Sequence, residues 1–159
     1  MSVIRYRGKT KIMHFKKTDT THALRDGGLV CLDDSSNLKP PANDSTDRVI
    51  GVARLNVALT DTSSWTGAPL VPVEVPVENA VEWLMDVDSD GGAADSDVGR
   101  YCAIDTTGGG SVLAGDSAGM RVDVSDTAIR QVFVTGRISA TKIVGVLAKQ
   151  GFTLPNDTV

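Results

Sequence analysis

Short runs of alternating apolar and polar residues occur along most of this chain, separated by clusters of glycine, serine, asparagine and aspartate. Alternation with a period of two is typical of half-buried β-strands, whereas amphipathic helices repeat their apolar positions every three or four residues. A short strand-like stretch covers residues 11–16, and the polar, proline-containing stretch 37–47 predicts a loop. The pattern predicts further strands at residues 29–32, 48–59, 70–77, 98–105, 120–124, 131–138 and 142–148.

The regular spacing of these strands, with turn residues between them, is typical of an all-β fold. We therefore predict a compact β-sandwich or a small β-barrel formed by residues 21–159, preceded by an extended basic N-terminal arm over residues 1–20. A length of 159 residues is close to that of one ordinary domain. No stretch repeats at a fixed period, so a solenoid or a propeller is not expected.

The run at residues 71–77 contains two prolines, Pro72 and Pro76. Proline has no N–H to donate to a neighbouring strand, so the run is predicted to be an edge strand or an extended arm, to which another subunit can add a strand. The alternative is a plain surface connection. The residues of this predicted subunit edge are Val71, Val73 and Val75.

Residues 77–85 fit two patterns, a helical stripe and a strand. The stretch is too short for its periodicity to decide between them. We favour a strand because the surrounding segments are predicted to be strands.

Charge is distributed unevenly along the chain. The formal net charge is −4 at pH 7, but residues 1–17 contain six basic side chains and no acidic one, which leaves ten basic and twenty acidic side chains elsewhere. A basic arm on an acidic body is suited to docking onto a negative surface or a neighbouring copy, the alternative being a merely solvated terminus. The predicted docking residues are Arg5, Arg7, Lys9, Lys11, Lys16 and Lys17.

No residue pattern typical of catalysis is present. The two histidines, His14 and His22, have no Cys, Glu or second His at ligand spacing. The glycine run 108–110 lacks the lysine of a phosphate-binding loop and predicts a hairpin turn. We therefore predict that the chain is not an enzyme. Cys31 and Cys102 are expected to be reduced, partly buried thiols of a protein made in the cytosol, although a single bridge between them stays open.

One acidic segment matches the opening of a calcium-binding loop, since residues 86–91 read D-V-D-S-D-G. The departures are Ala93 at the eighth position, an aspartate at the twelfth position, and a strand-like continuation where a helix would follow. We favour an acidic, solvated loop, with Ca²⁺ as the one candidate cofactor. Its candidate ligands are Asp86, Asp88, Asp90 and Asp97.

Nucleic-acid and membrane partners are not expected. The acidic body would repel a duplex, and Tyr6 and Phe15 alone do not form a stacking platform for single strands. The longest apolar runs are far shorter than the roughly 20 residues of a membrane-spanning helix.

Three segments together suggest a family. They are residues 28–32, followed by a polar loop and residues 49–53; the D-V-G-R-Y segment at 97–101; and the closing strands that begin at Gln131 and Lys142. In this order they resemble the capsid decoration or cement proteins of tailed bacteriophages. The acidic loop from Asp86 is a departure that the resemblance does not explain.

The resemblance implies a β-rich structural protein of the virion that binds and stabilises the outside of a phage capsid, often as a trimer. Its partners would be the major capsid protein and further copies of itself, and it would be made in the host cytoplasm. On this view deletion of residues 1–17 would weaken shell binding and leave the body folded. Two alternatives stay open: another virion component, such as a head-fibre base or a tail protein, and a calcium-stapled binding module.

Overall fold

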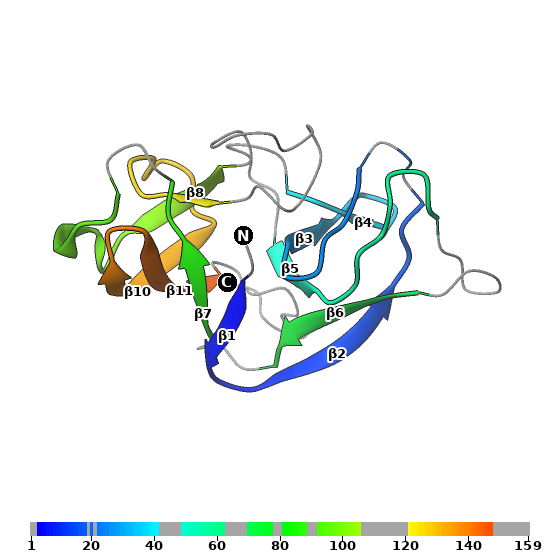
Figure 1. The fold of residues 1–159 in the computed structure, drawn as a ribbon, viewed down its shortest axis with the longest axis horizontal. Coiled ribbons are helices and arrows are strands. Elements are labelled where there is room, and N and C mark those ends of the chain that lie inside the picture. The colour runs from blue at the N-terminus through cyan, green and yellow to red at the C-terminus, as the bar shows by residue number, and fades with distance from the viewer. Residues whose placement is uncertain are drawn as a thin grey trace.

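The chain folds into two antiparallel β-sheets, which form the two lobes of the computed structural model in Figure 1. The structure describes residues 3–18, 20, 22–41, 49–62, 70–77, 81–88, 92–105 and 121–147. Within these residues the one helical element is a 3₁₀ turn, η1 (Asp95–Asp97). The all-β fold class is therefore confirmed, and the two sheets have a sandwich-like arrangement.

Sheet A contains six strands in the order β1-β7-β11-β10-β8-β9. Its longest neighbours, β10 and β11, form a hairpin whose register shifts between Val134 and Gly136 and again between Arg137 and Ser139. Such β-bulges increase the local twist of a sheet. The bounds are β1 (Ile4–Arg7), β7 (Glu82–Asp86), β8 (Tyr101–Asp105), β9 (Arg121–Asp123), β10 (Val132–Ser139) and β11 (Lys142–Leu147).

Sheet B contains five strands in the order β2-β6-β5-β3-β4. The sheet curls until its edges meet at one point, where the Leu38 N–H donates to the Lys16 carbonyl oxygen over 2.7 Å. Strands β5 and β6 approach so closely that a Cβ at Gly51 would lie 2.2 Å from the Glu74 carbonyl oxygen. The bounds are β2 (Thr10–Phe15), β3 (Leu29–Leu32), β4 (Leu38–Lys39), β5 (Val49–Ala53) and β6 (Val71–Pro76).

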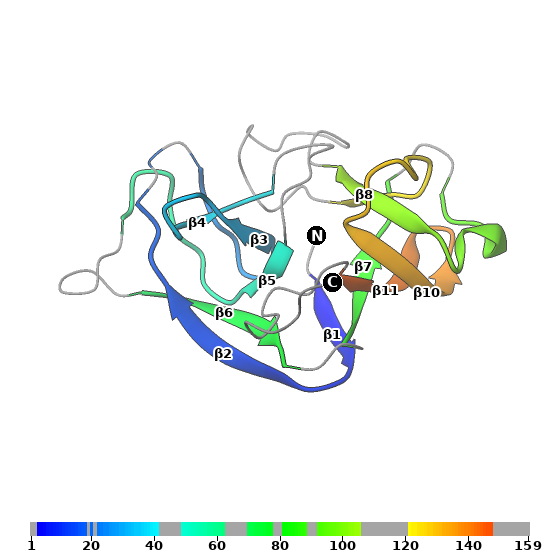
Figure 2. The same ribbon diagram turned by 180° about the vertical axis from the view of Figure 1, so that it is seen from behind.

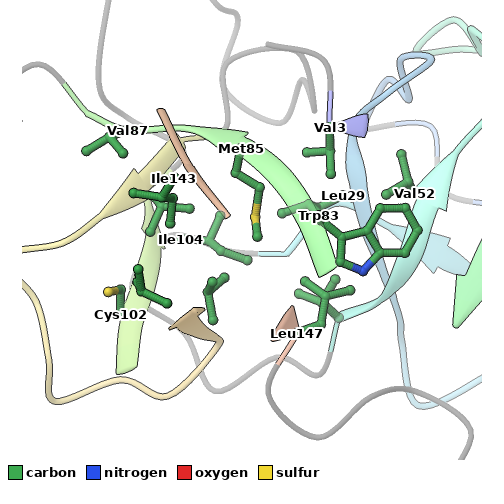
Figure 3. Packing of buried hydrophobic residues seen from close by; sticks show 14 of the residues in the cluster. Val3, Leu29, Val52, Trp83, Met85, Val87, Cys102, Ile104, Ile143 and Leu147 are labelled. Carbon is green, nitrogen blue, oxygen red and sulfur yellow. The ribbon is translucent and has the colours of Figure 1, made fainter. Parts of the chain in front are cut away.

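Two apolar cores hold these sheets together. The larger core lies between the sheets and packs Trp83 and Met85 of sheet A with Leu29 and Val52 of sheet B (Figure 3). The smaller core fills the inside of curled sheet B. Strands β3 and β5 therefore have apolar neighbours on both faces, which explains their continuous apolar sequences.

The first residues of the chain are part of both sheets. Strand β1 pairs with β7 in sheet A, and β2 pairs with β6 in sheet B. Val3 is fully buried in the larger core, while Met13 and Phe15 pack against the smaller one. The segment that we expected to extend as an arm therefore lies along the body as the outer strand of each sheet.

The predicted subunit edge on β6 is wrong as a description of this chain. Strand β6 lies between β2 and β5, and Val71, Val73 and Val75 are buried in the smaller core. In an antiparallel strand, the N–H and C=O groups of one residue point to the same side. The Pro72 carbonyl accepts the Arg54 N–H on the β5 side, so the N–H that Pro72 lacks would also point toward β5. Pairing with β2 uses the alternate residues Val71, Val73 and Val75, which keep their N–H groups.

Several predicted elements are confirmed with shorter bounds. The ambiguous segment contains a strand, β7, while its residues 78–80 lie outside the described residues. The long strand predicted at 48–59 ends at Ala53, and Leu55 is exposed. The strand predicted at 98–105 begins only at Tyr101, because η1 and a turn at Gly99 precede it. The loop predicted at 37–47 contains β4, which the sequence pattern did not indicate.

Candidate docking surface on the N-terminal strands

Strands β1 and β2 form the longest exposed strand edges of the described fold. Both are outermost in their sheets, and the other two outermost strands, β4 and β9, have two and three residues. Figure 1 shows β1 and β2 following each other along the lower rim of the molecule, and Figure 2 shows the same rim from behind. The rim therefore presents one continuous stretch of backbone from sheet A to sheet B.

The rim carries large apolar side chains on its surface. Tyr6 is 57% exposed and Ile12 is 51% exposed, and Ile4 is similarly exposed. Their exposure was not predicted. The available signal was the alternation of apolar and basic side chains over residues 4–7, whereas the sequence pattern predicted a strand only from residue 11 onward.

The backbone of β2 has one occupied side and one outward side. The Val77 N–H donates to the Lys9 carbonyl, so the odd-numbered residues of β2 pair with β6. Because hydrogen-bonding direction alternates along a strand, Thr10, Ile12 and His14 direct their backbone groups away from β6. No strand of sheet B pairs with that side over Thr10–Phe15 in the described residues.

The two arginines of β1 bind carboxylates of neighbouring strands. Arg7 donates from Nε to Glu82 Oε2 over 2.7 Å. Arg5 donates to the Thr10 hydroxyl over 2.9 Å, and its Nε lies 3.7 Å from Glu74 Oε1. These contacts hold the rim against the body. The charges of Arg5 and Arg7 are therefore partly neutralised within the chain, and less basic charge is available to a partner than the sequence predicts.

Glu74 of β6 connects three strands of sheet B by hydrogen bonds and reaches β1 of sheet A through its ion pair with Arg5. It accepts hydrogen bonds from Thr10 of β2 and from Arg54 after β5, at 2.7 Å and 2.8 Å. Burial would raise the pKa of Glu74, but these hydrogen bonds, with the charges of Arg54 and Arg5, lower it below the ordinary value of 4.5. The carboxylate is therefore ionised at neutral pH and fixes β1 and β2 in position.

Lys17 does not belong to a docking surface, which corrects the prediction from charge alone. The side chain is fully buried, and Nζ donates to the carbonyl oxygens of Leu59 and Asp61 over 3.2 Å and 2.9 Å. A buried ammonium group requires such partners because its desolvation is costly. Of the other predicted lysines, Lys9 and Lys11 are exposed and Lys16 is half-buried.

The candidate calcium ligands are occupied or lie apart from one another. Lys142 Nζ donates to Asp86 Oδ1 over 2.6 Å, and Asp97 Oδ2 accepts the N–H of Ala94, the residue before η1, over 2.8 Å. The Asp88 N–H donates to the Val122 carbonyl, and Asp90 lies outside the described residues. In the described part of the chain, no group of three metal-ligating side chains could hold an ion.

The two cysteines are buried thiols on different sheets, and no disulfide joins them. Cys31 Sγ lies 3.5 Å from the Lys39 carbonyl oxygen, to which it donates. Burial raises the pKa of Cys102 to about 12, assisted by the charges of Asp97 and Asp123. The Cys102 thiol is therefore protonated at neutral pH and unreactive as a nucleophile. The glycine run 108–110 lies outside the described residues.

Comparison of the chain with protein-family models, curated proteins and solved structures gives no significant match. The described residues also contain no helix that is long and apolar enough to cross a membrane. Assignment of a function therefore depends on the chemistry of the rim.

Proposed function

We propose that this protein is a structural component of a virion, a decoration protein that binds the outside of a phage capsid through its N-terminal strands. The observation that carries the proposal is the exposed rim of β1 and β2, which combines a strand edge, large apolar side chains and basic residues on an acidic body. This combination is typical of a docking site for an extended segment of a partner. It uses no catalytic group.

The partner segment would add to the outward side of β2 as a further strand. Its main chain would pair with Thr10, Ile12 and His14, and its apolar side chains would contact Tyr6 and Ile12. Within the chain, the carboxylates of Glu82 and Glu74 bind the arginines of β1, so negative side chains are favourable neighbours of this strand. We therefore expect an acidic segment of the major capsid protein at this position.

A second copy of β2 is a poorer partner for the same edge. Antiparallel pairing of two β2 strands centred on Thr10 would place Lys9 of each copy opposite Lys11 of the other. Like charges on neighbouring strands are unfavourable. Contacts between decoration proteins, including those of a trimer around a local symmetry axis, would then use other surfaces.

The first experiment adds purified protein to undecorated phage shells and examines the particles by electron microscopy. Regular additional density at the symmetry axes is the expected result. Bare shells, at protein concentrations up to about 100 μM, would contradict a decoration function. They would direct the search to fibre and tail components.

Two pairs of variants test the rim itself. Ile12→Pro removes an outward N–H without affecting the pairing with β6, whereas Ile12→Thr keeps this donor and serves as its control. Lys11→Glu reverses a charge on the rim, and Arg100→Glu makes the same change in net charge near the start of β8, away from the rim. We expect Ile12→Pro and Lys11→Glu to weaken shell binding about tenfold or more, and the controls to change it less than about threefold. Equal effects within either pair would contradict docking through β2.

A further inference from the structure

Three kinds of contact hold β1 at the edge of sheet A. Its main chain pairs with β7, and Val3, just before the strand, is fully buried in the larger core. The third kind is ionic, in the pairs that Arg7 forms with Glu82 and Arg5 with Glu74. The four side chains of β1 itself are exposed. The strand therefore contributes little apolar burial of its own beyond that of Val3.

Sheet A remains connected without β1. Beyond the end of β7, the Asp88 N–H donates to the Val122 carbonyl over 3.0 Å, and Val87 forms a parallel bridge with Val122. Strands β7, β11, β10, β8 and β9 therefore form a nearly closed ring. Strand β1 pairs with residues 82–84, a part of the β7 edge that the bridge to β9 does not reach. Detachment of β1 would thus expose the β7 edge while the remaining strands keep their neighbours.

Gly8 joins β1 to β2 at a bend between the two sheets. Its φ of 103° lies in the left-handed region, which residues with a side chain rarely adopt. Figures 1 and 2 show the chain turning a corner between the two strands. The sequence pattern continues through this corner, because a basic side chain occupies every second position from Arg5 to Lys11. Such alternation favours one straight strand, so the bend depends on the contacts that β1 makes with sheet A.

We infer that copies of this chain exchange β1, each copy placing the strand on the β7 edge of a neighbouring copy. The occupant of that edge is then the segment that the structure shows on it. The burial of Val3 and the ion pairs of Arg5 and Arg7 are all made again, now between two chains. With Gly8 straightened, β1 extends from β2 toward the neighbour. Exchange of an identical element is a low-cost route to assembly, since it replaces contacts within a chain by the same contacts between chains.

The charges beside Gly8 decide the form of the exchange. In a reciprocal pair, two straightened segments centred on Gly8 would run antiparallel, with Arg7 of one copy opposite Lys9 of the other. Like charges directly opposite each other are unfavourable. A head-to-tail ring, in which each copy gives β1 to the next, keeps these segments apart. The inference does not rest on the proposed capsid function, and the ring leaves the outward side of β2 available.

The short connection at Gly8 sets the concentration at which exchange occurs. It keeps β1 close to the β7 edge of its own chain, at an effective concentration in about the millimolar range. Dilute chains therefore retain their own β1. Exchange requires protein at about 1 mM, or a surface that gathers copies to a comparable local concentration.

Cross-linking between two different variants tests the exchange. Ile4 of β1 is paired with Leu84 of β7, so their Cβ atoms lie about 4.5–5.5 Å apart. One chain carries Ile4→Cys and the other carries Leu84→Cys. Dibromobimane, a short reagent that joins two thiols, links these chains efficiently only when β1 of the first lies on β7 of the second. The native Cys31 and Cys102 are buried and are the same in both chains.

A second mixture measures links formed by random collision. Here Asp95→Cys replaces Leu84→Cys, because the Asp95 side chain is 93% exposed and belongs to η1, which does not pair with β1. After incubation at about 1 mM, we expect at least about tenfold more linked dimer with Leu84→Cys than with Asp95→Cys. Equal yields from the two mixtures overturn the inference.

A matched pair of glycine variants tests the hinge. Gly8→Val strains the bent connection and favours the straight one, so it should lower the protein concentration needed for linking by about tenfold. Gly99→Val introduces the same left-handed strain outside the exchanged segment, since Gly99 has a φ of 88° and its Cβ would meet nothing within 4 Å. It should change that concentration less than about threefold. Circular dichroism verifies that both variants are folded, and equal effects of the two substitutions overturn the inference.

Discussion

Individual charged residues in the N-terminal segment have three different roles that their common charge conceals. Arg5 and Arg7 bind carboxylates of the neighbouring strands, whereas Lys17 is buried against two carbonyl oxygens. Lys11 remains on the exposed rim. A positive side chain is therefore available to a partner only where it is not already bound within the chain. Arg5 is less available because it forms an ion pair with Glu74.

Replacement of Glu74 by glutamine should destabilise the protein at neutral pH by about 1–2 kcal/mol, because it removes charge-assisted hydrogen bonds. The folded-state pKa of Glu74 is lowered, so its contribution to stability is fully present above the ordinary value of 4.5. That contribution is lost as the pH falls through the lowered pKa. The difference between parent and variant should therefore shrink below about pH 4.

Urea denaturation of both proteins between about pH 3 and pH 8 measures this difference. Asp95→Asn is the control, since the Asp95 side chain is 93% exposed although it contacts Arg137. Its effect on the free energy of unfolding should stay below about 0.5 kcal/mol. A pH-independent difference for Glu74→Gln would show that the carboxylate does not stabilise the sheets through its charge.

At the scale of elements, the N-terminal strands complete both sheets and are also their exposed edges. Strand β2 covers β6, and β1 covers β7, so β6 and β7 each have a neighbour on both sides. The prolines of β6 are compatible with this position because at least Pro72 lacks its donor on the β5 side. The prediction from proline content alone therefore identified β6 as the edge strand, whereas the edge strand is its neighbour β2.

Removal of residues 1–17 should abolish cooperative folding, in contrast to the intact body that charge segregation led us to expect. The deletion removes Val3 from the larger core and Met13 and Phe15 from the smaller one. Full burial of a side chain such as Val3 contributes about 1.5–3 kcal/mol, and the partly buried Met13 and Phe15 contribute less. Together with the lost backbone pairing of β1 and β2, the deletion approaches the whole stability of an ordinary domain.

Thermal melting followed by circular dichroism tests this expectation. The truncated chain should show no sharp transition, and the parent chain should show one. A cooperative transition of the truncated chain within about 5 °C of the parent would mean that β1 and β2 are dispensable. Point variants such as Lys11→Glu are therefore better probes of docking than a deletion.

At the scale of the whole molecule, a basic rim faces outward from an acidic body. Long-range attraction to a negative surface would orient the protein before the β2 edge makes contact. Salt screens this attraction, since the screening length falls from about 10 Å at 0.1 M to about 3 Å at 1 M.

Shell binding should accordingly become weaker with increasing salt, mainly through slower association. Association and dissociation rates measured on immobilised shells between about 0.05 and 0.5 M sodium chloride test this expectation. The main-chain pairing and apolar contacts predict a dissociation rate that changes less than about threefold over the same range. An association rate that is independent of salt would contradict electrostatic steering by the rim.

The sequence alone determined the fold class and most strand positions, because alternation and turn residues are local properties. Strand β3 was predicted at its observed bounds, and β10 and β11 to within about one residue. The sequence also located the basic segment, since charge can be counted along the chain. It gave no indication of β4, whose two residues are too few to show a pattern.

Only the tertiary structure decided which strands are neighbours, and therefore which residues are accessible. Pairing across long sequence separations placed β2 beside β6, which buried Val71, Val73 and Val75 and made β2 the edge in their place. The same packing buried Lys17 and exposed Tyr6. Edges, buried charges and outward apolar faces depend on contacts between distant segments, whereas strand formation depends mainly on neighbouring residues.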